Sequence, residues 1–127
     1  MVLGYLLARA GIEVLVLEKH ADFLRDFRGD TVHPSTLELM NELGVLEELL
    51  KIPHQRIAKV RARIAGDDVV LSDMTPLRTC CRFMAVMPQW DLLNFLAERG
   101  KRYPTFLLKN ANGCHRHYRG RRADHRC

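Results

Sequence analysis

The sequence lacks the features that mark several common classes of protein. No stretch approaches the ~20 consecutive apolar residues that a bilayer span requires. The apolar start at Met1–Ala8 has no basic segment of the kind that opens a secretory signal. The four cysteines show no C-x-x-C spacing, and a disulfide between the adjacent Cys80 and Cys81 would be strained. We therefore expect free thiols, no membrane span and a cytoplasmic protein.

Catalytic and metal-binding signatures are missing as well. We find no nucleophilic residue with a catalytic partner and no pair of carboxylates at a spacing that indicates catalysis. The sequence also has no internal repeat. The C-terminal set of Cys114, His115, His117, His125 and Cys127 does not have the ligand spacing of common zinc sites. We therefore predict no metal site and no catalytic side chain.

The positive charge is confined to one end of the chain. Residues 114–127 hold five arginines and one aspartate, a charge of +4, so the remaining 113 of the 127 residues supply +1 of the net +5. A basic tail is weaker evidence for a partner than a basic face on a folded domain. One alternative is a small nucleic-acid-binding protein that acts through this tail, with steep salt dependence. With one isolated tyrosine for base stacking, we expect no specific nucleic acid.

The length of 127 residues, with 47% hydrophobic and 28% charged residues, fits one folded domain. Residues 2–10 carry the apolar stripe of an amphipathic helix, and Gly11 stands where a left-handed residue ends one. Residues 12–17 form a nearly continuous β-branched run that predicts a strand buried on both faces, as in parallel sheets. Glu18 follows it. This order is the second half of a βαβ unit.

The rest of the chain predicts alternating elements. Ser35 and Glu38 make a capping box at the start of a helix, after a polar loop over 19–34. We further expect a short helix over 45–51, a hairpin within 57–73 around Gly66-Asp67-Asp68, a strand over 82–87, a helix over 89–98 and a strand over 103–109. Residues 110–127 contain no leucine, isoleucine or valine and so cannot bury a face.

Three side chains suit a dinucleotide ligand. Glu18 at the carboxyl end of a strand can accept hydrogen bonds from a ribose hydroxyl pair, or it is simply solvated. Arg28 can hold phosphate oxygens bidentately, or it is an exposed loop arginine. Gln89 can offer amide hydrogens to a ligand at a helix start, or it caps the first turn. Gly4, inside the first helix, suggests close packing of helix on sheet.

Three blocks of this sequence together resemble one family. Residues 3–19 (LGYLLARAGIEVLVLEK) are similar to the stretch after the GxGxxG loop of para-hydroxybenzoate hydroxylase-type FAD-dependent monooxygenases. Residues 28–38 (RGDTVHPSTLE) with Leu43-Gly44-Val45, and residues 87–93 (MPQWDLL) with Leu96, resemble the next two blocks in the same order. The resemblance covers residues 1–108.

The resemblance implies a fold and a cofactor. The fold would be α/β, an incomplete FAD-binding Rossmann-like domain with a parallel sheet over residues 1–109 and a partial inserted β segment over 55–87. FAD would be bound by Glu18 at the adenosine ribose, by the neighbouring Lys19, by Arg28 near the pyrophosphate and by Gln89 on the flavin side. The activity would be hydroxylation of a small aromatic substrate with NAD(P)H and dioxygen.

The sequence departs from the family at both ends. The first strand and the glycine loop fall before Met1, and a later glycine–aspartate block that contacts the ribityl chain is absent. We expect the basic tail of residues 110–127 to be disordered or to follow a frameshift near 107–113. We expect a fragment that is inactive as it stands. Half of a nicotinamide-linked dehydrogenase is the enzyme alternative, although such a protein has no reason to carry the Arg28 and Gln89 blocks.

Overall fold

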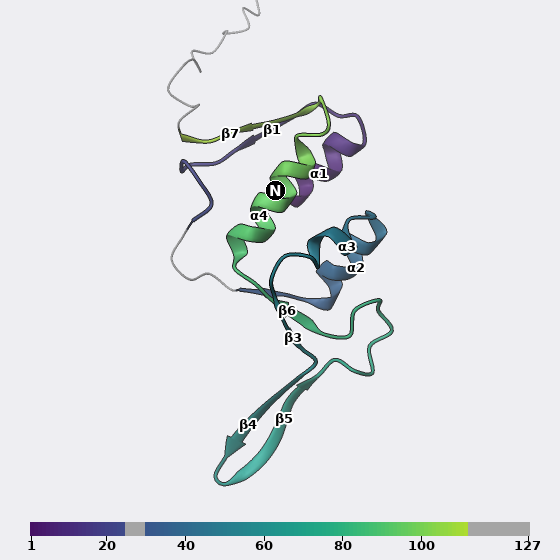
Figure 1. The fold of residues 1–127 in the computed structure, drawn as a ribbon, viewed down its shortest axis with the longest axis vertical. Coiled ribbons are helices and arrows are strands. Elements are labelled where there is room, and N and C mark those ends of the chain that lie inside the picture. The colour runs from purple at the N-terminus through teal and green to yellow at the C-terminus, as the bar shows by residue number, and fades with distance from the viewer. Residues whose placement is uncertain (25–29, 112–127) are drawn as a thin grey trace, which may run out of the picture. The chain divides into compact units, whose positions relative to one another are not determined.

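A computed structural model describes residues 1–24 and 30–111 (Figure 1). Arg28 and residues 112–127 of the basic tail therefore lie outside the described residues. The expectation that this tail is disordered or follows a frameshift falls on these residues and also lies outside the description. The described residues form two compact units, one from residues 1–23 and 96–111 and the other from residues 24 and 30–95. Together the described residues give a mixed α/β fold with one parallel sheet and two antiparallel sheets.

The first unit joins the two ends of the described chain. It contains α1 (Val2–Arg9), β1 (Val14–Leu17), β7 (Phe106–Lys109) and the last turn of α4 (Gln89–Gly100). β1 and β7 pair in parallel, with Val14 opposite Phe106 and Leu17 opposite Lys109. Gly11 ends α1 with φ +79°, as the sequence predicts, because only glycine adopts this left-handed conformation without strain.

Two glycines let the helices approach the covered face of this sheet. A Cβ on Gly4 would lie 2.5 Å from Val16 Cγ2, and a Cβ on Gly100 would lie 2.7 Å from Phe106 Cζ. Both distances are too short for a real contact, so neither position accepts a larger side chain without movement. α1 and the last turn of α4 therefore lie on the same side of the β1–β7 pair (Figure 1), and both glycines face the Phe106 ring. The prediction that Gly4 is a packing glycine is confirmed.

The opposite face of the parallel pair is exposed. Leu15, Leu17 and Leu107 retain 40%, 62% and 51% of their accessible surface. The prediction that this strand is buried on both faces is therefore wrong for the described residues. The reason is that side chains alternate along a strand, and α1 and α4 cover only the face that carries Val14 and Val16.

The second unit contains two helices, a three-stranded sheet and a hairpin. Its elements are β2 (Thr31–Val32), α2 (Pro34–Glu42), α3 (Leu46–Leu49), β3 (Gln55–Ile57), β4 (Lys59–Ile64), β5 (Asp67–Asp73) and β6 (Met84–Val86), followed by the first part of α4. β6 is the central strand between β2 and β3, and both pairings are antiparallel. Leu37, Met40 and Leu49 are fully buried where α2 and α3 pack together.

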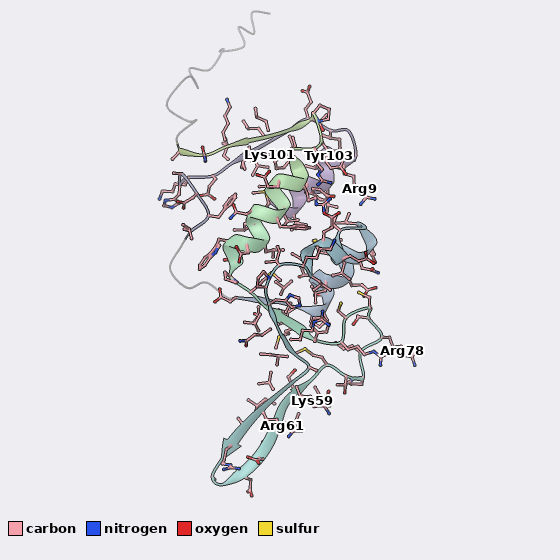
Figure 2. The ribbon with its side chains drawn as sticks, viewed as in Figure 1. Arg9, Lys59, Arg61, Arg78, Lys101 and Tyr103 are labelled. Carbon is pink, nitrogen blue, oxygen red and sulfur yellow. The ribbon has the colours of Figure 1, made fainter. Side chains whose placement is uncertain are left out.

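The predicted hairpin is confirmed as β4–β5, but its turn falls one position earlier. The two loop residues are Ala65 (φ 53°) and Gly66 (φ 99°), whose positive φ values are those of a type I′ turn. Lys59 and Arg61 project from β4 (Figure 2). Lys59 Nζ lies 2.9 Å from Asp73 Oδ2, and Arg63 Nε lies 2.9 Å from Asp68 Oδ1, so two ion pairs connect β4 to β5.

The predicted capping box at Ser35 is wrong. The N-cap of α2 is His33, two residues before Ser35, with Pro34 in the first turn, and no side chain caps the helix. Proline is favoured at this position because its fixed φ suits a helix and it has no N–H to satisfy. The Glu38 carboxylate instead accepts a hydrogen bond from the backbone N–H of Cys80, 2.7 Å away.

Candidate dinucleotide site

The carboxyl ends of β1 and β7 lie in the first unit, next to Glu18, the residue predicted to bind the ribose. The backbone N–H of Glu18 donates to the carbonyl of Lys109 at 2.8 Å, and the N–H of Ala111 donates to the carbonyl of His20 at 3.1 Å. Asn110 Nδ2 reaches the carbonyl of Ala21 at 2.6 Å. The loop after β1 is therefore fastened to the end of β7, which fixes the backbone that carries Glu18.

The Glu18 carboxylate is oriented by its own loop. Its Oε1 atom accepts a hydrogen bond from the backbone N–H of His20 at 2.9 Å, and the residue is half-buried, whereas Lys19 beside it is exposed. An acidic side chain at the carboxyl end of a parallel strand that follows a packed helix can accept hydrogen bonds from ribose hydroxyls. The described residues therefore fit the ribose end of a dinucleotide.

A pocket of about 460 Å³ in the same unit does not belong to this site. It is lined by Glu13, Val14, Leu15, Pro104, Thr105 and Leu107. These residues lie at the amino ends of β1 and β7, whereas ligands of parallel α/β sheets bind outside the carboxyl ends. This pocket therefore lies at the opposite end of the β1–β7 pair from Glu18.

The second unit brings together the chain segments that flank Arg28 and Gln89. Thr31 pairs with Val86 across the β2–β6 ladder, and the backbone N–H of Met87 donates to the carbonyl of Asp30 at 2.8 Å. Asp30 follows Arg28 by two residues, and Gln89 follows Met87 by two. Two of the sequence blocks that resemble the flavoprotein family are therefore neighbours in space.

A pocket of about 410 Å³ opens beside this junction. It is lined by Asp30, Pro53, His54, Gln55, Val86, Met87 and Pro88. Gln89 is exposed and is the first residue of α4, directly after the pocket's Pro88. The predicted site residues thus fall into two groups: Glu18 and Lys19 in one unit, and Gln89 in the other. Arg28 lies outside the described residues.

Sequence reasoning missed the polar residues of this pocket. His54 Nδ1 lies 2.7 Å from the carbonyl of Ile52, and His54 Nε2 lies 3.2 Å from Arg56 Nε, which can only donate. The Arg56 guanidinium also lies 4.8 Å from the centroid of the Phe83 ring. The one signal in the sequence was Pro53, which ends the preceding helical segment and lies two residues before the short strand β3.

Neither a metal-binding cluster nor a membrane-spanning helix occurs among the described residues. Among residues 1–24 and 30–111, no group of three histidine, cysteine or acidic side chains could hold a metal ion. No helix in these ranges has the length and apolarity that a bilayer crossing requires.

The parallel pairing and the helix packed on it through Gly4 form an α/β unit. The family described as "FAD binding domain" matches residues 1–123, and the chain belongs to this family. FAD is therefore the cofactor of this domain, and the resemblance drawn from the three sequence blocks is confirmed.

The relatives are monooxygenases. The chain is 27% identical over 106 residues to 6-methylpretetramide 4-monooxygenase of Streptomyces rimosus, a match that covers 84% of this chain and 25% of the relative. Two solved structures share the fold at 20% identity: p-nitrophenol 4-monooxygenase PnpA of Pseudomonas putida, with a TM-score of 0.68, and PqsL of Pseudomonas aeruginosa, described as a probable FAD-dependent monooxygenase, with a TM-score of 0.67.

These matches also give the extent of the similarity. The PnpA match covers 84% of this chain and 28% of that chain, and the PqsL match covers 85% and 29%. The chain therefore spans about a quarter of the length of its curated relative. The matched region corresponds to part of each of these relatives.

Proposed function

We propose that this chain serves a flavin-dependent monooxygenase that hydroxylates a phenolic or related aromatic ring, with NAD(P)H as reductant and dioxygen as the oxygen source. Its membership of the FAD-binding family supports the cofactor, and the monooxygenase names of its relatives support the reaction class. The observation that carries the proposal is the Glu18 carboxylate, held at the end of β1 by the N–H of His20.

Each predicted residue receives one role in this proposal. Glu18 accepts hydrogen bonds from the adenosine ribose, with Lys19 beside it. Arg28 lies near the pyrophosphate, and Gln89 contacts the flavin side from the start of α4. FAD, when bound, supplies the activation of dioxygen, while the protein supplies binding and orientation. The described residues offer no catalytic acid or base to this reaction.

The chain on its own is proposed to be catalytically inactive. It spans about a quarter of its curated relative, and Glu18 and Gln89 alone are few contacts for so large a cofactor. We expect the purified chain to retain little or no FAD after desalting. Flavin absorbance at one FAD per chain, with NAD(P)H oxidation, would contradict this part of the proposal.

The role of Glu18 is tested by a matched pair of substitutions. Glu18→Gln removes the charge that ribose hydroxyls would meet, whereas Glu13→Gln makes the same change at the amino end of β1. A hydrogen bond to a charged group contributes about 1.5–3 kcal/mol, so Glu18→Gln should weaken FAD binding by about 10- to 150-fold. The measurement is a titration of FAD, followed by flavin fluorescence, at concentrations high enough to saturate the weak binding of the parent chain. Equal affinity in the two variants would refute the ribose role.

A further inference from the structure

The exposed face of the β1–β7 pair carries an ordered set of side chains (Figure 1). Alternate residues of a strand share one face, so this face holds Leu15 and Leu17 of β1. The same alternation places Leu107 and Lys109 of β7 there. Leu15 lies opposite Leu107, and Leu17 lies opposite Lys109. The three leucines are therefore neighbours on a surface that no described element covers.

Such a patch is unusual for the open side of a sheet. Sheets that are covered on one face commonly carry polar side chains on the other. Exposed apolar residues that stand alone need no explanation, whereas neighbouring ones mark a surface that binds another molecule. Leu17 is the most exposed of the three, at 62%. The composition of this face therefore favours an interaction surface.

A hollow and a projecting leucine lie at opposite ends of this face. The pocket of about 460 Å³ is lined by Glu13, Leu15 and Leu107, among others, at the amino ends of the strands. Leu17 follows Glu13 by four residues, which is about 13 Å along an extended chain. A surface of this form can pack on a copy of itself that runs in the opposite direction, because each leucine then meets the other copy's hollow.

The charges on this face have the same polarity. Glu13 lies at the amino end, in the wall of the hollow, and Lys109 lies at the carboxyl end, beside Leu17. Both side chains are exposed, and neither forms an ion pair within the described part of the chain. A second copy that runs antiparallel brings the acidic end of each face to the basic end of the other. The face is therefore complementary to itself in charge as well as in shape.

We propose that this face joins two copies of the chain about a two-fold axis that crosses the strands. The two β1–β7 pairs stack about 10 Å apart, with β1 of one copy antiparallel to β1 of the other. Leu17 of each copy enters the hollow of the other, and Lys109 of each approaches Glu13 of the other. Every contact occurs twice, so the assembly closes at two chains. The patch is small, so the association is weak, and it requires no bound FAD.

Charge reversal tests the antiparallel arrangement. Sedimentation velocity of the whole chain, from about 10 μM to about 1 mM, should show a monomer that becomes a dimer as the concentration rises. Glu13→Lys and Lys109→Glu each place two pairs of like charges in the interface, so each should raise the Kd about tenfold or more. An equimolar mixture of the two variants should dimerise as the parent does, because both pairs then have opposite charges. A mixture that stays as monomeric as its components would refute this arrangement.

A pair of serine substitutions tests the apolar contact. Leu17→Ser should abolish the dimer over the same range of concentrations. Leu3→Ser is the matched control, because Leu3 is 68% exposed on α1, on the other side of the β1–β7 pair. It should leave the Kd unchanged, and both variants should keep the circular dichroism spectrum of the parent. A parent chain that is monomeric throughout, assemblies larger than two chains, or the same Kd in both serine variants would overturn the proposal.

Discussion

Replacement of Gly4 by alanine tests how α1 is fitted to the parallel sheet. In an exposed helix, this change should stabilise the protein by about 1 kcal/mol, because glycine is a poor helix former. Here the new Cβ would lie 2.5 Å from Val16 Cγ2 and 3.4 Å from Phe106 Cε2. The valine methyl is the closer obstacle, and it belongs to a short, stiff side chain on β1.

The magnitude follows from these two opposing effects. Overpacking of a filled interior costs about 1–3 kcal/mol, and an overlap of this size belongs in the upper part of that range. Subtracting the helix-propensity gain of about 1 kcal/mol leaves a net loss of about 1–2 kcal/mol in the free energy of unfolding. Val16→Ala removes the obstructing methyl, so it should restore about 2 kcal/mol when it is combined with Gly4→Ala.

The assay is urea unfolding, followed by circular dichroism, of the parent chain, both single variants and the double variant. Gly11→Ala is the control, because Gly11 has φ +79° and a Cβ at this position would have no other atom within 4 Å. It should cost about 1 kcal/mol through backbone strain alone, and Val16→Ala should not rescue it. Stabilisation by Gly4→Ala, or additive effects of Gly4→Ala and Val16→Ala, would refute the packing argument.

Two further predictions concern the β4–β5 hairpin. Hydrogen bonds from Lys59 and Thr75 lower the pKa of Asp73 from 3.8 to about 2. The ionised Asp73 should therefore stabilise the folded chain fully above the unfolded pKa of 3.8. This stabilisation should be lost as the pH falls through the folded pKa of about 2. Between these two pH values, the melting temperature should fall less in Asp73→Asn than in the parent. Ala65→Asn should stabilise the chain by about 0.5–1 kcal/mol in urea unfolding, because asparagine tolerates the positive φ of 53° in this type I′ turn better than alanine; a destabilisation larger than that of Ala65→Val would contradict this reasoning.

Local signals in the sequence predicted most of the elements. The stripe of residues 2–10, the left-handed Gly11 and the helix that begins at Gln89 all occur where their patterns indicate. These features depend on neighbours a few residues apart, so the sequence displays them directly. The pairing of residues 31–32 with 85–86 does not depend on near neighbours, and no pattern within either short strand reveals it.

The predictions that were wrong also depended on contacts between residues far apart in the sequence. The Ser35-x-x-Glu38 pattern is a capping box by spacing, but Glu38 accepts from the N–H of Cys80, 42 residues further along the chain. The apolar run of residues 12–17 suggested burial on both faces, yet burial depends on which elements cover each face. For the candidate site, the position of Glu18 at a strand end could be predicted from the sequence, whereas the pocket around His54 could not.

The connection between the two ends of the described chain has a consequence for the order of folding. β1 and β7 are hydrogen-bonded neighbours, yet Val14 and its partner Phe106 are separated by the whole of the second unit. Contacts of such long sequence separation form late, because the intervening loop must first be closed. During synthesis on a ribosome, α1 and β1 emerge first and remain without their partner strand until almost the last described residue has been added. Residues 30–95 of the second unit can meanwhile form contacts of shorter sequence separation. The segment that contains α1 and β1 is therefore synthesised first but should be among the last to reach its native structure.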